Sequence, residues 1–246
     1  MLKLTKLNKL DEAKDTNVFV QDNILDSNYY SILLKSFPFN EMQRKDVHNK
    51  TAMNKYNVDA VDKFLKVNKD WKIFVEYFLS QDFINFLNVN FSASNRGQHY
   101  LSSHLTVGYE FSILGDGAQV VPHKDKYGKL FSFVFYFVPE GWNKKNSYGG
   151  TQFYEPKNRL LNKKIFNGGS NFESMNCVAE VTPSPNRLLI FEPNNTSWHG
   201  VEPISTDDSF GRPAFIVTIH RKRTHLENLY EKCSFITSRI QKYLFN

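Results

Sequence analysis

The sequence predicts a mainly β protein, of the sandwich, barrel or jelly-roll type, that is supported by helices. From about residue 101 onward, short runs rich in β-branched and aromatic residues follow one another at close spacing, and Gly, Pro and Asn separate them. Prolines stand at the ends of these runs, where they leave the hydrogen bonds of a sheet intact. The predicted strands are 105–114, 118–125, 130–139, 149–156, 176–183, 186–193, 197–204 and 212–221.

Helical spacing precedes and follows this β-rich part. Apolar residues recur three and four positions apart over 58–67, from Trp71 to Leu79, and from Phe83 to Leu87, with Ser80 as the expected cap before the last of these helices. The spacing returns after residue 226. Because no linker separates these regions, we expect a single domain over 1–246. It would comprise a helical support region at about 1–100, a β-core at about 101–221 and a C-terminal helix at about 222–246.

Composition excludes several classes of protein. Hydrophobic residues make up 41% of the chain, which suffices for a core, yet no apolar run is long enough to cross a bilayer. The N-terminus lacks the apolar segment of a signal peptide, and Cys177 and Cys233 have no disulfide-framework or zinc-ligand spacing. We therefore expect a soluble, cytoplasmic protein with reduced thiols and no membrane partner.

The chain has a net charge of +6, and its clearest basic cluster is "HRKRTH" at 220–225. Such a cluster can bind phosphates, but a solvated face is the commoner explanation. No base-reading motif accompanies it, so nucleic acid is not an expected partner.

The stretch "VVPHKDKYGK" holds a candidate metal-binding motif. On an extended chain, the side chains of His123 and Asp125 point to the same face. His199 lies in "NTSWHGVEP" at the expected start of a strand, where Gly200 leaves room beside the ring. Two histidines and one carboxylate form the facial triad of non-haem Fe(II), which leaves three positions for a bidentate co-substrate and dioxygen. Chance His-x-Asp pairs are common, however, and an ordinary hydrogen-bonded histidine remains the alternative for His199.

Arg212 adds a fourth candidate residue. It follows His199 by 13 positions (212 − 199 = 13) and opens the last predicted strand. If that strand is the antiparallel neighbour of the strand of His199, the guanidinium enters the same barrel. A buried arginine is costly unless it meets an anion, and its planar fork suits a carboxylate. A dicarboxylic co-substrate could then span from iron to Arg212; Arg221 is the competing choice, but it adjoins other basic residues.

Taken together, these residues resemble the Fe(II)/2-oxoglutarate-dependent dioxygenases, and most closely the prolyl-4-hydroxylase-like branch. The resemblance covers residues 105–221, with 74 positions from Asp125 to His199 (199 − 125 = 74). It rests on motifs that follow one another in the family's order: His123-x-Asp125, "FSFVFYFV", Gly149-Gly150, "PNRLLIFEP", Trp198-His199-Gly200-Val201 and Arg212.

This resemblance implies a double-stranded β-helix core (jelly-roll, cupin-like). It implies that His123, Asp125 and His199 are the iron ligands and that Arg212 binds the distal carboxylate of 2-oxoglutarate. The implied cofactors are Fe(II), 2-oxoglutarate as co-substrate, and dioxygen, with ascorbate as a candidate reductant. The implied reaction is hydroxylation of an unactivated C–H coupled to decarboxylation of 2-oxoglutarate to succinate. Asp125 fills the position that halogenases leave open for chloride, which argues against a halogenase.

Two departures from the family pattern leave the second anchor of 2-oxoglutarate open. Leu114 and Val120 stand where relatives often have a tyrosine, and Ala214 stands where many have Ser or Thr. Thr151 or Gln152 could supply the missing contact.

Three functional hypotheses follow. The first is a hydroxylase of a small metabolite, such as an amino acid or a biosynthetic intermediate. The second is a peptidyl hydroxylase acting on a protein side chain such as proline, and the third is a β-sandwich binding module without catalysis. The segment 157–176 is either a lid or an ordinary surface loop, and Lys124, Trp142 and Trp198 are candidates for lining the mouth of the site. Because the C-terminal helix could pack on the barrel or form a dimer, a monomer and a homodimer both remain open.

Overall fold

The computed structural model of the chain describes residues 2, 7–13, 15–44, 52–57, 61–91, 99–125, 128–142, 149–158, 160, 169–206 and 211–222. The α-helices are α1 (Ser27–Lys35), α2 (Val61–Val67), α3 (Lys69–Tyr77) and α4 (Gln81–Phe91). Short 3-10 turns are η1 (Phe39–Glu41), η2 (Ser102–His104) and η4 (Phe172–Ser174). The strands are β1 (Asn8–Lys9), β2 (Asn17–Gln21), β3 (Gln43–Arg44), β4 (Ala52–Asn57), β5 (Leu105–His123), β6 (Lys129–Tyr136), β7 (Thr151–Pro156), β8 (Met175–Val181), β9 (Arg187–Glu192), β10 (Trp198–Val201) and β11 (Arg212–Arg221).

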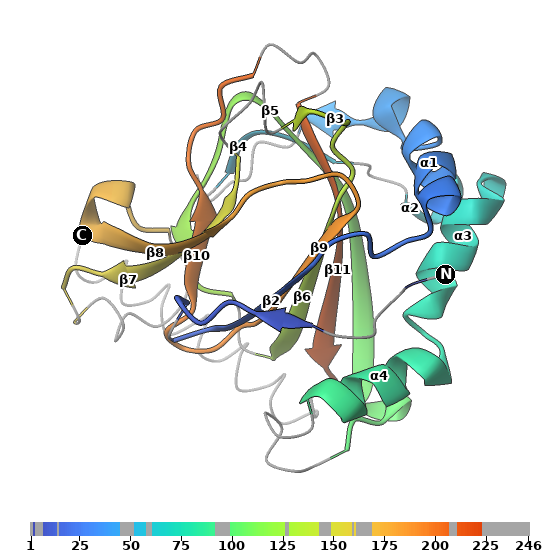
Figure 1. Ribbon diagram of the computed structural model, residues 1–246, viewed down its shortest axis with the longest axis horizontal. Coiled ribbons are helices and arrows are strands. Elements are labelled where there is room, and N and C mark those ends of the chain that lie inside the picture. The colour runs from blue at the N-terminus through green and yellow to red at the C-terminus, as the bar shows by residue number, and fades with distance from the viewer. Residues whose placement is uncertain are drawn as a thin grey trace, which may run out of the picture.

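These strands form one curled antiparallel sheet in the order β1-β2-β9-β6-β11-β5-β10-β7-β8, with β4 also paired to β5. The curl comes from β5, whose first part pairs with β11 and whose last part pairs with β10. Figure 1 shows β7, β8 and β10 on one side of the barrel and β6, β9 and β11 on the other. The core is therefore the predicted jelly-roll double-stranded β-helix.

The aromatic run that begins with Phe131 has two buried faces. Phe131, Phe133 and Phe135 pack in the cluster that includes the helices, whereas Val134 and Tyr136 pack in a second cluster inside the barrel. Successive side chains of a strand point to opposite faces, so a strand that is covered on both sides reads as an uninterrupted apolar run. This alternation decides which residues of β6 can reach a site inside the barrel.

The helices α1 to α4 cover the outer face of the sheet (Figure 1). Trp71 of α3 is fully buried there, with its ring 4.6 Å from that of Phe111 and 5.1 Å from that of Phe215, and its Nε1 donates a hydrogen bond to the Leu33 carbonyl at 3.2 Å. The Ser80 hydroxyl accepts a hydrogen bond from the Phe83 amide at 3.2 Å. The predicted cap before α4 is thus confirmed.

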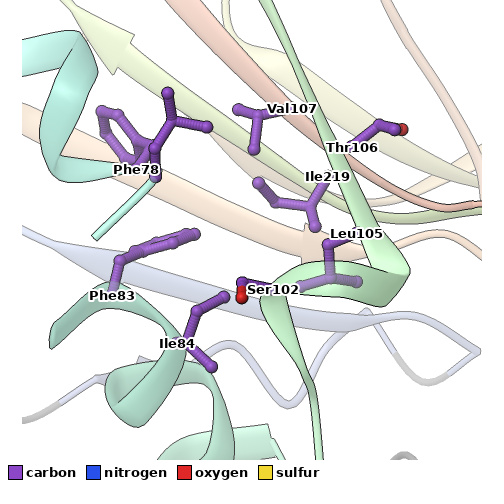
Figure 2. A pocket seen from close by; sticks show the side chains of 9 residues that line it. Phe78, Phe83, Ile84, Ser102, Leu105, Thr106, Val107 and Ile219 are labelled. Carbon is purple, nitrogen blue, oxygen red and sulfur yellow. The ribbon is translucent and has the colours of Figure 1, made fainter. Parts of the chain in front are cut away.

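An apolar pocket of about 260 Å³ lies between these helices and the sheet (Figure 2). Phe78 and Phe83 line it from the helical side, and Leu105 and Ile219 line it from β5 and β11. These strand residues belong to the helix-facing cluster, so the pocket and the barrel interior lie on opposite faces of the sheet.

Two sequence expectations about organisation need correction. The first hundred residues are not only helical, because β2 pairs with β9 and β4 pairs with β5. The two runs at 105–114 and 118–125 belong to one strand, β5, which continues through Gly115 and Gly117 although Gly117 has a positive φ of 67°. The C-terminal helix expected at 222–246 falls outside the described residues from 223 onward. Within the part of the chain that is described, no helix has the length and apolar character needed to cross a membrane.

Candidate metal centre

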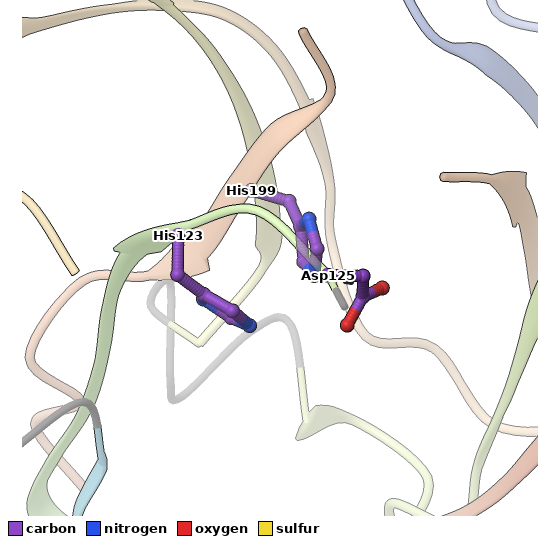
Figure 3. A group of neighbouring side chains, drawn as sticks. All are labelled: His123, Asp125 and His199. Carbon is purple, nitrogen blue, oxygen red and sulfur yellow. Dashed lines mark ion pairs between the residues drawn. The ribbon is translucent and has the colours of Figure 1, made fainter. Parts of the chain in front are cut away.

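His123, Asp125 and His199 lie together at the end of β5. His123 is the last residue of β5 and pairs with His199 of β10, and Asp125 follows two positions later. The two imidazole ring centroids are 4.4 Å apart. One potential ligand atom from each of the three residues lies within 4.8 Å of the other two. The side chains converge from two neighbouring strands, as Figure 3 shows.

In both imidazoles, Nδ1 faces a backbone carbonyl and Nε2 is the nitrogen available to a metal. Nδ1 of His123 lies 3.0 Å from the Val121 carbonyl, and Nδ1 of His199 lies 3.1 Å from the Ser197 carbonyl. Because a carbonyl only accepts, each Nδ1 is assigned the proton, which leaves the lone pair of Nε2 for a metal. Burial, with the neighbouring His199 adding to it, lowers the pKa of His123 to about 3, and burial also lowers the pKa of His199. The two rings are neutral at pH 7, as metal ligands require.

The two carboxylate oxygens of Asp125 differ in their surroundings. Oδ1 accepts a hydrogen bond from Lys129 Nζ at 2.8 Å. Oδ2 is buried, lies 3.7 Å from Nε2 of His199, and has no hydrogen-bond partner among the described residues. Burial acts to raise the pKa of Asp125, but His199, Lys129 and His123 together outweigh it and lower that pKa.

An ionised, buried oxygen without a partner is costly. A divalent cation placed among this oxygen and the two imidazole lone pairs would satisfy all three groups. The donor set of two neutral imidazoles and one carboxylate fits non-haem Fe(II).

The pairing of β10 with β5 requires glycine next to His199. A Cβ built on Gly200 would lie only 2.5 Å from the carbonyl oxygen of Val120. The sequence suggested that Gly200 leaves room beside the histidine ring, but the close contact is with the backbone of β5. This close approach holds His199 opposite His123.

Arg212 opens β11 and is buried, with 4% of its surface exposed. It pairs with Leu114 of β5, and β5 lies between β11 and β10. From the sequence, the strands of Arg212 and His199 were considered as direct neighbours, and they are not. Its Nη1 donates to the Gly149 carbonyl, its guanidinium carbon lies 5.5 Å from the centre of the Tyr136 ring, and its Nε has no partner among the residues that the structure describes. Arg221, the competing candidate, is exposed at the far end of the same strand. Arg212 is therefore a buried cation placed to receive an anion.

Comparison with known proteins identifies this arrangement. Residues 109–219 match the family model of the 2OG-Fe(II) oxygenase superfamily. The β-core therefore resembles the 2OG-Fe(II) oxygenases. The match supports an enzyme that uses Fe(II), 2-oxoglutarate and dioxygen. It agrees with the resemblance already seen in the sequence, and no curated protein matches the chain.

Two solved structures are similar to the chain. The prolyl hydroxylase from Trichoplax adhaerens in complex with a hypoxia inducible factor oxygen degradation domain peptide fragment is 13% identical, with a TM-score of 0.53 and 83% of each chain covered. A Pseudomonas putida prolyl-4-hydroxylase is 15% identical, with a TM-score of 0.46, 87% of this chain covered and 96% of that chain covered. At this identity, the first of these supports the fold of the oxygenase and no finer property.

A continuous row of side chains leads from the triad of the oxygenase toward Arg212. His199 pairs with Phe153 of β7, and Thr151 lies two positions along the same face. The Thr151 hydroxyl is 2.8 Å from that of Tyr136, and the ring of Tyr136 lies beside Arg212. A same-face step along one strand is about 7 Å, and a step to the paired strand is about 5 Å. Thr151 and Tyr136 thus connect the strand that pairs with His199 to Arg212.

This row distinguishes the two candidates for a second anchor of 2-oxoglutarate. Thr151 faces the interior, whereas Gln152 faces the other way and bonds to Glu180 at 3.1 Å and to the Tyr154 hydroxyl. Sequence reasoning missed Tyr136. The alternation in "FSFVFYFV" could have found it, because Tyr136 shares the inner face with Val134 and is fully buried with a hydroxyl to satisfy.

The residues proposed to line the mouth lie elsewhere. Trp142 is 1% exposed within the apolar cluster inside the barrel, so it does not border an opening. Trp198 is 3% exposed and packs with Tyr154 and Met175. Lys124 lies with its Nζ 5.2 Å from the centre of the Trp198 ring.

Part of the predicted lid segment borders the triad. Within 157–176, residue 159 and residues 161–168 lie outside the described range. The described end packs on β5, where the Ser170 amide donates to the Pro122 carbonyl at 2.7 Å, directly before His123. The contact places this end of the segment beside the triad, and closure of the segment over a substrate stays a prediction.

Proposed function

We propose that the protein is a hydroxylase that couples the oxidative decarboxylation of 2-oxoglutarate to the hydroxylation of an unactivated aliphatic C–H. The observation that carries this proposal is the buried cluster of two neutral imidazoles and a carboxylate with one unpartnered oxygen. Iron bound there would supply the chemistry by which dioxygen, 2-oxoglutarate and a substrate R–H yield succinate, carbon dioxide and R–OH.

Each residue of the triad has one task in this scheme. Nε2 of His123, Oδ2 of Asp125 and Nε2 of His199 would hold the iron. The two Nδ1 protons stay on the Val121 and Ser197 carbonyls and fix the orientation of both rings. With three protein ligands, half of an octahedron remains for the co-substrate and dioxygen.

Arg212 would bind the distal carboxylate of 2-oxoglutarate through two parallel hydrogen bonds. Its Nε is unpartnered among the described residues, and its buried charge needs a counter-anion. The hydroxyls of Tyr136 and Thr151 stand next to it and would complete the carboxylate site. These two hydroxyls would replace the family contacts that Leu114, Val120 and Ala214 cannot make.

The walls of the barrel would keep this site dry. The Phe191 ring packs beside the triad, 4.7 Å from that of His199 and 5.5 Å from that of Phe153. Exclusion of water strengthens the ion pair with Arg212 and limits loss of the oxidant to solvent.

Two substrate classes enter the proposal. The first is a small metabolite, such as an amino acid or a biosynthetic intermediate, as the sequence suggested. The second is a prolyl side chain in a peptide. It is favoured by one observation: the fold is similar over 83% of both chains to a prolyl hydroxylase whose structure holds a peptide. Succinate release, with ascorbate as reductant, would be compared between free amino acids and proline-containing peptides.

An anaerobic spectrum tests the proposed function. Addition of Fe(II) and then 2-oxoglutarate to the metal-free protein should produce the metal-to-ligand charge-transfer band of a chelated 2-oxo acid. The band should be lost in His199→Ala and Asp125→Ala and retained in His104→Ala, which changes an exposed histidine. A band of full intensity in His199→Ala would overturn the proposed iron site, and the absence of iron binding in the wild type would favour the binding-module hypothesis.

A further inference from the structure

Among the described residues, Lys129 makes the shortest ionic contact to a residue of the triad. It is the first residue of β6, and its Nζ lies 2.8 Å from Oδ1 of Asp125. Its side chain is 18% exposed and that of Asp125 is 10% exposed, so the pair is largely screened from water. A charge-assisted hydrogen bond of this length in a partly buried place is strong enough to fix the carboxylate.

The contact makes the two oxygens of Asp125 unequal. Oδ1 is taken by the ammonium group, whereas Oδ2 faces Nε2 of His199 at 3.7 Å. We propose that Lys129 is a positioning residue that holds Asp125 as a one-oxygen ligand of the metal and thereby keeps a coordination position open for dioxygen. This inference rests on the proposed function of the triad.

The number of coordination positions around Fe(II) explains why a one-oxygen ligand matters. Two imidazoles and one carboxylate oxygen occupy three of the six positions around Fe(II), and a chelated 2-oxo acid occupies two more. One position is left for dioxygen. A carboxylate that bound through both oxygens would fill that last position. The hydrogen bond from Lys129 to Oδ1 would oppose this, because Oδ1 would have to share its lone pairs between the ammonium group and the metal.

An alternative role for Lys129 makes the opposite prediction. If the ammonium group acted only as a nearby positive charge, its removal would strengthen binding of the metal and would leave dioxygen access unchanged. Lys124 supplies the matched control for this role. Lys124 stands between His123 and Asp125 in the sequence, but its Nζ lies over the Trp198 ring.

The test compares Lys129→Met, Lys129→Arg and Lys124→Met with the wild type, each loaded anaerobically with Fe(II) and 2-oxoglutarate. The charge-transfer band reports the chelated co-substrate. Titration with nitric oxide, followed by electron paramagnetic resonance, then reports whether the last coordination position is open. Methionine keeps the length of the lysine stem, and thermal denaturation verifies that each variant is folded.

We expect the band to form in all four proteins. The affinity for nitric oxide should fall about 10- to 100-fold in Lys129→Met, a range typical for the loss of a group that hydrogen-bonds to a metal ligand. It should be largely restored in Lys129→Arg. Lys124→Met should match the wild type. Wild-type affinity for nitric oxide in Lys129→Met would overturn the positioning role while leaving the proposed function intact. Absence of the band in the wild type would overturn both.

Discussion

Replacement of Arg212 by methionine tests the co-substrate site most directly. The guanidinium is 4% exposed and has no carboxylate partner among the described residues. If it makes two hydrogen bonds to the distal carboxylate of 2-oxoglutarate, each contributes about 1.5 kcal/mol or more, because one partner is charged. Their loss costs about 3 kcal/mol, which corresponds to a roughly 100-fold weaker complex.

The same substitution should leave the metal-free protein nearly as stable as before. Methionine removes a buried charge that lacks a counter-ion, and this gain offsets the lost hydrogen bond to the Gly149 carbonyl. We expect the free energy of unfolding to change by less than about 1 kcal/mol. A loss of 2-oxoglutarate binding without a loss of stability would separate a binding role from a structural one.

The assay is an anaerobic titration of the Fe(II)-loaded protein, followed by the charge-transfer band. Two ligands are compared: 2-oxoglutarate, and 2-oxovalerate, which has the same carbon chain without the distal carboxylate. The wild type should prefer 2-oxoglutarate by about 100-fold, and Arg212→Met should lose most of that preference. Arg221→Met, at the exposed end of the same strand, should behave as the wild type. The reasoning is refuted if Arg212→Met keeps the preference, or if Arg221→Met loses it.

Three further predictions concern pH, strand approach and the helical support. The pKa of His123 is about 3 in the folded protein and about 6.5 in the unfolded chain, so between these pH values the unfolded state binds more protons. The metal-free protein should therefore lose about 1 kcal/mol of stability between about pH 6.5 and 5.5, a loss that urea denaturation would show to be smaller in His123→Gln. Gly200→Ala places a Cβ 2.5 Å from the Val120 carbonyl, and should lower both stability, by about 1–3 kcal/mol, and Fe(II) affinity; unchanged affinity would argue against the close pairing of β10 with β5. Trp71→Ala should cost about 3–5 kcal/mol of stability yet leave Fe(II) affinity of the folded protein intact, because Trp71 packs on the helical side of the sheet; a selective loss of iron would contradict this separation.

The strands and the grouping of the triad residues were predictable from sequence for a local reason. Alternation and turn residues are properties of a few neighbouring positions. They predicted both ends of β11 correctly, and they predicted the ends of β6 and β7 to within two residues except at the end of β6. His123 and Asp125 share a face because they stand two apart on an extended chain. The structure brings His199 to them as the sequence predicted.

Features that depend on distant pairing were missed. The sequence places Arg212 after His199, but it cannot say that β5 lies between their strands. It also cannot show that Lys129 reaches Asp125, because the contact depends on how the chain returns from β5 into β6. The strand β2 escaped notice since only Val18 of its five residues is fully buried, which gives too little alternation to detect.

The position of β5 between β10 and β11 explains how the two ends of the site are kept at a fixed separation. Leu114 of β5 pairs with Arg212, and His123 of the same strand pairs with His199. Backbone hydrogen bonds of one continuous strand therefore set the register at both ends, and nine positions of β5 (123 − 114 = 9) separate them. Sites built on strands in this way are held more tightly than sites on independent loops. The stretch of β5 between these residues is irregular, with a positive φ at Gly117 and a register shift where β5 pairs with β10. Inserting or deleting one residue directly before His123 would move His123 and Asp125 out of register with His199. Such a change should abolish iron binding even where the strand still forms, whereas an added residue in an exposed turn outside β5 should be tolerated.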